Sequence, residues 1–61
     1  MDLVKIGEKI KQLREKSGLT QSNIAQYLSL DQSTIAKFEK GERNISLSVL
    51  EKLSTLFCLS L

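Results

Sequence analysis

In the stretch DQSTIAKFEKGER, residues 31–43, a few apolar residues are surrounded by polar side chains that can form hydrogen bonds. On a helix that begins at Gln32, the side chains of Gln32, Ser33 and Lys37 would project from one face. Ile35 and Phe38 would hold the other face against the rest of the protein. A glutamine amide offers a donor and an acceptor together, a serine hydroxyl can serve as either, and a lysine ammonium donates. This face is therefore suited to recognising a partner through hydrogen bonds.

The residue types do not favour catalysis or metal binding. Histidine is absent from the 61 residues, which removes the commonest general base and the commonest zinc ligand. The lone cysteine, Cys58, has no intrachain partner for a disulfide, and we expect it to be a small core or chain-end residue. The acidic residues fall mostly at solvent-facing helical positions. We therefore expect no enzyme activity, no cofactor and no metal.

Composition favours a small helical protein outside the membrane. Hydrophobic residues make up 41% of the chain, proline is absent and only three glycines are present, which favours helices over strands. No apolar run reaches the length of a signal-peptide core or of a membrane span. The formal net charge of +2 permits nucleic-acid binding without requiring it. Because no disulfide is possible within the chain, the reducing cytoplasm is the expected location.

The first helix can be placed from the spacing of its apolar residues. These recur every three or four positions near the start of the chain, with charged residues between them, which is typical of an amphipathic helix. Asp2 can cap its beginning, and Gly18 stands where a chain can turn left-handed to end a helix. We predict a helix from Leu3 to Ser17.

One local order of residues occurs three times in the rest of the chain. It consists of an apolar residue, a capping side chain, three variable positions and a second apolar residue that can pack on the first. The three sets are Leu19-Thr20 with Ile24, Leu30-Asp31 with Ile35, and Ile45-Ser46 with Leu50. They predict short helices at residues 21–28, 32–40 and 47–57.

The second and third predicted helices are separated by a very short turn. Only residues 29–31 lie between them, so the helices must cross steeply, as in a helix-turn-helix. Ala25 supplies the small residue that such a crossing needs. The other residues expected at this contact are Ile24, Leu28, Ile35 and Phe38. We predict an all-α fold: a compact bundle of four to five short helices around a central helix-turn-helix, with residues 1–61 forming one domain.

The segment TQSNIAQYLSLDQSTIAKFEKGERNIS resembles the phage repressor and Cro type of helix-turn-helix family, also called the xenobiotic response element or lambda-repressor-like family. The resemblance rests on the joint order of Leu-Thr-Gln at 19–21, Ile-Ala at 24–25, Gln-Ser-Thr-Ile at 32–35, Glu-x-Gly at 39–41 and Arg-Asn-x-Ser at 43–46. In such proteins the second helix of the motif lies in the major groove of DNA. The resemblance implies a sequence-specific, double-stranded DNA-binding transcriptional regulator.

Site residues follow from matching positions in that family. The resemblance implies that Gln32, Ser33 and Lys37 read base edges. It implies contacts to the DNA backbone from Gln21, Lys40, Arg43, Asn44 and Ser46. Gln21 would also brace Gln32, and the last three residues precede a helix whose free N–H groups suit phosphate. Arg14 and Glu39 resemble a partly buried salt bridge that ties the first helix to the third.

The chain departs from the family pattern at several positions. Ser29 replaces a glycine expected in a left-handed turn, and Asn23 replaces the glutamate that would complete a capping box with Thr20. Cys58 replaces a glycine that commonly follows the fourth helix. Many members continue into a fifth helix, so the chain is either the N-terminal part of a longer protein or one whose apolar tail, Leu59 and Leu61, packs against a second copy.

The leading functional hypothesis is an operator-binding repressor of bacterial or phage type. It would act as a homodimer on a palindromic operator, in the cytoplasm and associated with the nucleoid. The alternative is a protein-interaction module, such as an antitoxin or antirepressor adaptor, because a fold alone does not fix its function. Binding to a protein partner that persists at salt concentrations high enough to disrupt contacts with DNA phosphates would favour the alternative.

Overall fold

The computed structural model describes residues 2–60, which form four α-helices: α1 (Leu3–Lys16), α2 (Gln21–Leu28), α3 (Gln32–Lys40) and α4 (Leu47–Ser60). This order confirms the predicted all-helical fold. The bounds of α2 and α3 are those read from the sequence, and α1 ends one residue before the predicted Ser17. Within the described part of the chain, no helix is both long and apolar enough to cross a membrane.

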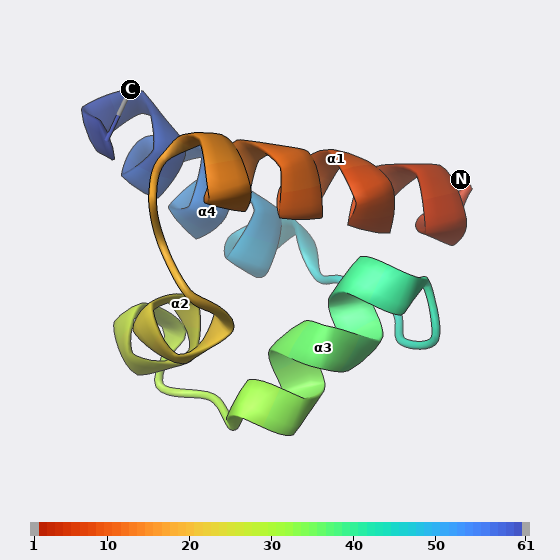
Figure 1. The fold of residues 1–61 in the computed structure, drawn as a ribbon. Helices are drawn as coiled ribbons and strands as arrows, with labels where there is room; N and C mark the ends of the chain where they lie inside the picture. Colours follow the sequence, from red (N-terminus) through yellow and green to blue (C-terminus); the bar gives the residue numbers. More distant parts are fainter. Residues whose placement is uncertain (1, 61) are drawn as a thin grey trace.

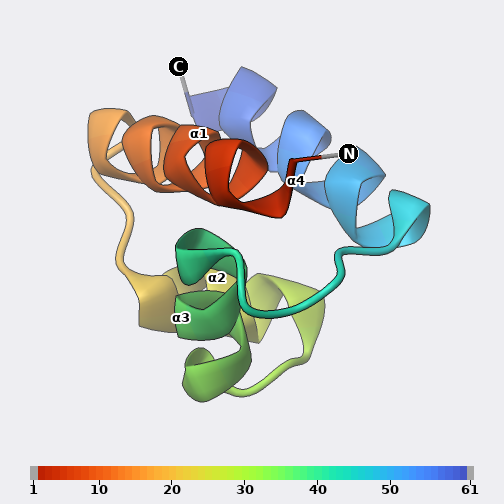
Figure 2. The same ribbon diagram turned by 90° about the vertical axis from the view of Figure 1, so that its right-hand side faces the viewer.

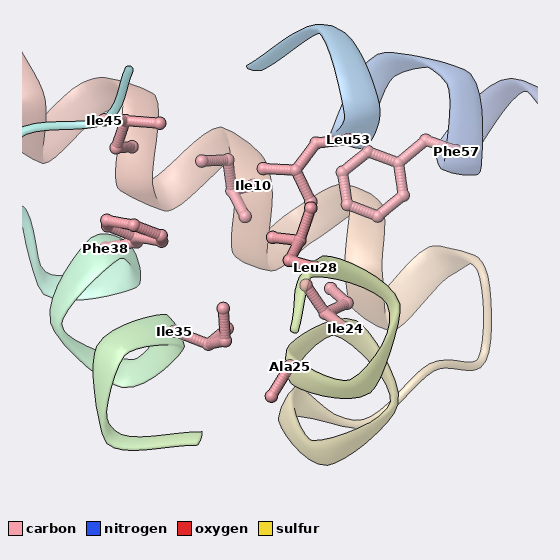
Figure 3. Close-up of a cluster of buried hydrophobic side chains, with 9 residues drawn as sticks. All are labelled: Ile10, Ile24, Ala25, Leu28, Ile35, Phe38, Ile45, Leu53 and Phe57. Atoms are coloured by element: carbon pink, nitrogen blue, oxygen red, sulfur yellow. The ribbon is translucent and has the colours of Figure 1, made fainter. Parts of the chain in front are cut away.

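The helices form two layers, with α1 and α4 side by side on one side of the molecule and α2 and α3 on the other (Figures 1 and 2). Nine buried apolar residues fill the space between the layers (Figure 3). They are Ile10 from α1, Ile24, Ala25 and Leu28 from α2, Ile35 and Phe38 from α3, Ile45 from the loop before α4, and Leu53 and Phe57 from α4. The five residues predicted to join the second and third helices all belong to this cluster.

The start of α2 is capped more completely than its sequence indicated. The Thr20 hydroxyl accepts from the Asn23 backbone N–H at 3.0 Å, and the Asn23 side-chain oxygen accepts from the Thr20 N–H at 2.9 Å. Asn23 was expected to leave this capping box incomplete, and that expectation is wrong. An asparagine side chain is one methylene shorter than the usual glutamate, yet its carbonyl oxygen still reaches the cap residue.

The turn from α2 to α3 uses a left-handed residue, as the family pattern implied. Ser29 has φ of 57°, and Leu30 donates its N–H to the Ala25 carbonyl at 2.9 Å across the helix end. Asp31 precedes α3 with an extended backbone, but its carboxylate forms no capping hydrogen bond. Asp31 therefore occupies the N-cap position as predicted, but the side-chain hydrogen bond expected of a capping residue is not formed. Leu30 also stays 36% exposed, so it contributes little to the core.

The last helix differs from its predicted form. Ser46 caps α4, its hydroxyl accepting from the Val49 N–H at 3.2 Å, but the helix continues to Ser60 instead of ending near residue 57. Cys58 consequently lies inside α4, where it is exposed and lines an open apolar groove of about 370 Å³ between α1 and α4. It is not a core residue and it does not follow the helix, but it lies near the end of the chain, which was the other position expected for it. Leu59 is 81% exposed, and Leu61 lies outside the described residues.

Gly7 is buried where α1 crosses the end of α3. A Cβ atom at this position would lie in contact with the backbone carbonyl oxygen of Phe38 and 2.7 Å from that of Glu39. The two helices therefore approach as closely as their backbones allow. Sequence reasoning did not single out Gly7, because only the packing of α1 on α3 reveals the need for it.

Candidate nucleic-acid interface

The three candidate reading residues occupy the outer face of α3. Gln32, Ser33 and Lys37 are all exposed, while Ile35 is 1% and Phe38 4% exposed on the inner face. Each residue turns the helix by about 100°, so Gln32, Ser33 and Lys37 fall within one arc of the helix surface. Ile35 and Phe38 fall on the opposite side. The inner residues anchor α3, and the outer side chains are available to a partner.

Gln21 lies between the outer face of α3 and the interior of the protein. Its side-chain Nε2 donates to Glu39 Oε1 at 3.0 Å, and its Oε1 accepts from Gln32 Nε2 at 3.5 Å. The second contact is at the long end of the hydrogen-bond range. Gln21 begins α2 and Gln32 begins α3, so the contact joins the starts of both helices of the motif.

The interior end of this chain of contacts is an ion pair. Arg14 Nε donates to Glu39 Oε2 at 2.6 Å and Nη2 donates to Oε1 at 3.2 Å, in the bidentate arrangement that suits a guanidinium. The side chain of Arg14 is 12% exposed and that of Glu39 is 3% exposed. Donating its hydrogen bonds to Glu39 raises the pKa of Arg14 above its ordinary value, so the guanidinium remains cationic. Arg14 also donates to the Leu19 carbonyl at 3.0 Å, which fixes the turn before α2.

The candidate backbone-contacting residues lie along the segment from the end of α3 to the start of α4. Lys40 is the last residue of α3, and Arg43 and Asn44 lie in the following loop; all three are exposed. Ser46 is exposed as well, but its hydroxyl oxygen is occupied in capping α4. The hydroxyl hydrogen of Ser46 can still be donated to a phosphate oxygen.

Sequence reasoning anticipated the partners of this network only in part. It paired Arg14 with Glu39, and Gln21 with Gln32, but it did not connect the two pairs. The structure joins them through the hydrogen bond from Gln21 to Glu39. No local signal could have shown this link, because residues 21 and 39 come together only when α2 and α3 cross.

Comparisons with known proteins identify relatives over most of the chain. The family model described as Helix-turn-helix matches residues 10–61. The control protein C.MunI of Mycoplasma is 42% identical over 52 residues, which cover 84% of this chain and 70% of that protein. A putative HTH-type transcriptional regulatory protein of Pyrococcus furiosus is 33% identical over 51 residues, which cover 84% of this chain but only 16% of that protein.

A solved structure agrees with the sequence relatives. The restriction-modification controller protein C.AhdI from Aeromonas hydrophila superposes with a TM-score of 0.85 at 40% identity, covering 93% of this chain and 86% of that one. These findings place the chain among DNA-binding regulatory proteins and confirm the resemblance read from its motifs. The chain belongs to the helix-turn-helix family of sequence-specific DNA-binding transcription regulators.

Proposed function

We propose that the protein is an operator-binding repressor that places α3 in the major groove of double-stranded DNA and binds as a homodimer. The observation that carries this proposal is the outer face of α3, where Gln32, Ser33 and Lys37 are exposed while the inner face is buried. In this motif, residues near the start of the second helix contact base edges. The cytoplasm, with association to the nucleoid, is the location that such a role requires.

The proposed readers match the chemistry of the major groove. A glutamine amide can pair with adenine through its N6 and N7 atoms, and a lysine can donate to guanine O6 and N7. A serine hydroxyl can serve either kind of edge. We assign base reading to Gln32, Ser33 and Lys37 on this basis.

The remaining contacts would go to phosphate groups, which fix the position of the protein without reading sequence. We assign this role to Gln21 at the start of α2, and to the segment from the end of α3 to the start of α4. The residues in that segment are Lys40, Arg43, Asn44 and Ser46. Arg43 and Lys40 supply positive charge, while the start of α4 offers backbone N–H groups.

A homodimer on a palindromic operator follows from the small number of readers. Three side chains per protomer specify few base pairs, and dimers of this class join two half-sites about 34 to 36 Å apart. Both C.MunI and C.AhdI are described as control or controller proteins, the latter of restriction and modification. We propose that restriction–modification genes are among the targets of this protein.

Substituting the readers is expected to change sequence preference rather than binding in general. Gln32→Ala and Lys37→Ala should each cost about 1 to 3 kcal/mol of binding free energy, confined to particular base pairs. Arg43→Ala should weaken binding similarly on all sequences and reduce the slope of log affinity against log salt by about one. Titrations of a duplex library at two salt concentrations measure both effects.

The matched control for these substitutions is Gln26→Ala, which alters an exposed residue of α2 outside the proposed interface. It should leave affinity and preference unchanged. If Gln32→Ala and Lys37→Ala behave like this control on every duplex, the proposed readers are wrong.

The dimer is tested by selection from random duplex DNA. We expect enrichment of a palindrome whose half-site centres are one helical turn apart, with occupancy that rises cooperatively with protein concentration. A duplex with one half-site destroyed should bind much more weakly than the intact palindrome. Enrichment of single half-sites would contradict the dimer, and salt-sensitive binding without any enriched sequence would favour the protein-interaction alternative.

A further inference from the structure

The buried carboxylate of Glu39 determines which atoms donate and which accept in the hydrogen bonds that connect it, through Gln21, to Gln32 on the outer face of α3. Its side chain is 3% exposed, and its two oxygens accept from Arg14 and from Gln21. A carboxylate paired with a guanidinium offers acceptors only. The atom of Gln21 that faces Glu39 must therefore be the amide nitrogen, and the Gln21 oxygen must face away.

This direction continues to the next amide. Because the outer atom of Gln21 is an oxygen, Gln32 must turn its own nitrogen toward it, as the 3.5 Å contact from Nε2 to Oε1 shows. One hydrogen of the Gln32 amide is used in this contact. Its carbonyl oxygen and its second N–H remain for an outside partner.

The remaining acceptor and donor of Gln32 match one purine better than the other. Adenine presents a donor at N6 and an acceptor at N7, whereas guanine presents two acceptors, O6 and N7. A reversed Gln32, with its oxygen turned to residue 21, would present only N–H groups outward and would suit guanine. That reversal would place the oxygen of Gln21 against an oxygen of the buried carboxylate, so that two acceptors would face each other with no hydrogen between them.

We propose that Glu39, acting through Gln21, sets Gln32 to prefer adenine over guanine at its base pair. The proposal rests on the DNA-reading function proposed above. Glu39 is then a positioning residue in addition to being the ion-pair partner of Arg14. Its side chain would influence sequence choice although it is buried away from the DNA.

The test compares the four bases at a single position of the operator. The base pair read by Gln32 is first located as the one whose preference Gln32→Ala abolishes. Dissociation constants of the full chain are then measured on the four duplexes for the wild type, Gln21→Met, Gln21→Lys and Glu39→Gln. Gln26→Met is the matched control, since it makes the same replacement at an exposed position of the same helix.

Each variant has a distinct expected result. The wild type should favour adenine over guanine by roughly tenfold, within the range that one bidentate contact supplies. Gln21→Met, which leaves the Arg14–Glu39 pair intact, should reduce the ratio to about twofold or less, and the preference at the base pair read by Lys37 should persist. Gln21→Lys, a donor to both Glu39 and the Gln32 oxygen, should shift the ratio toward guanine.

Glu39→Gln tests whether the carboxylate of Glu39 orients the amide of Gln21, since the new amide can present a donor to Gln21. Folding of this variant is verified by circular dichroism, and its adenine-to-guanine ratio should fall.

A loss of affinity that is uniform across all duplexes in Gln21→Met, with the ratio unchanged, would overturn the inference while leaving the DNA-reading function intact. A wild-type preference for guanine at this position would also overturn it. Absence of any base preference in the wild type would overturn both proposals.

Discussion

Replacing Gly7 with alanine is expected to lower the free energy of unfolding by about 2 to 3 kcal/mol. The added Cβ would contact the Phe38 carbonyl oxygen and approach that of Glu39 to 2.7 Å. Both are backbone atoms of α3, so they cannot move aside as the end of a flexible side chain would. Alanine gains about 1 kcal/mol over glycine in helix propensity, which offsets the clash only in part.

Urea unfolding followed by circular dichroism measures this effect. A domain of this length has a total stability of about 3 to 9 kcal/mol, so the expected loss is a large share of it. Glu8→Ala, on the exposed side of the same helix, is the control and should change stability by no more than about 0.5 kcal/mol. Equal midpoints for Gly7→Ala and the wild type would show that α1 can move off α3 without loss.

Glu39→Ala is expected to destabilise the fold by about 3 to 5 kcal/mol, because it leaves the Arg14 guanidinium without its partner. The Arg14 side chain is only 12% exposed, so water cannot fully replace the lost carboxylate. Gln21 would lose its acceptor as well. Arg14→Ala should be comparably harmful, since the carboxylate left behind is 3% exposed.

A double replacement tests whether the cost of the alanine variants comes from leaving one charge buried without its partner. Arg14→Met combined with Glu39→Leu removes both charges, and it should be clearly more stable than either alanine variant. Glu42→Ala, at an exposed acidic residue after α3, is the matched control with an expected change within about 0.5 kcal/mol. If Glu39→Ala costs no more than Glu42→Ala in thermal or urea unfolding, the ion pair does not support the fold.

Features that depend on neighbouring residues in the sequence could be predicted well. The bounds of α2 and α3 followed from capping residues and from the spacing of apolar residues, which act within one or two helical turns. The end of α4 could not be placed, because residues 57–60 contain neither glycine nor proline to end a helix. The caps at Asn23 and Asp31 were misjudged, since side-chain identity alone does not fix whether an oxygen reaches an N–H group.

Features that depend on the crossing of helices could be predicted only from the family resemblance, or not at all. The Arg14–Glu39 pair came from matching family positions, and the contact from Gln21 to Glu39 was not foreseen. The need for glycine at position 7 depends on how closely α1 approaches α3, a distance that no sequence pattern encodes. The outer face of α3 was predictable because helical periodicity alone determines which side chains share it.

The side chains that would meet a target and those that hold the fold are almost separate sets. Gln32, Ser33 and Lys37 are exposed and lie outside the buried apolar cluster, whereas Gly7 and Glu39 lie at the contact between α1 and α3. Exchanging the three exposed residues should therefore redirect the protein to new sites with little loss of stability. Descendants of such a chain can acquire different targets one surface residue at a time, provided that the inner contacts are kept.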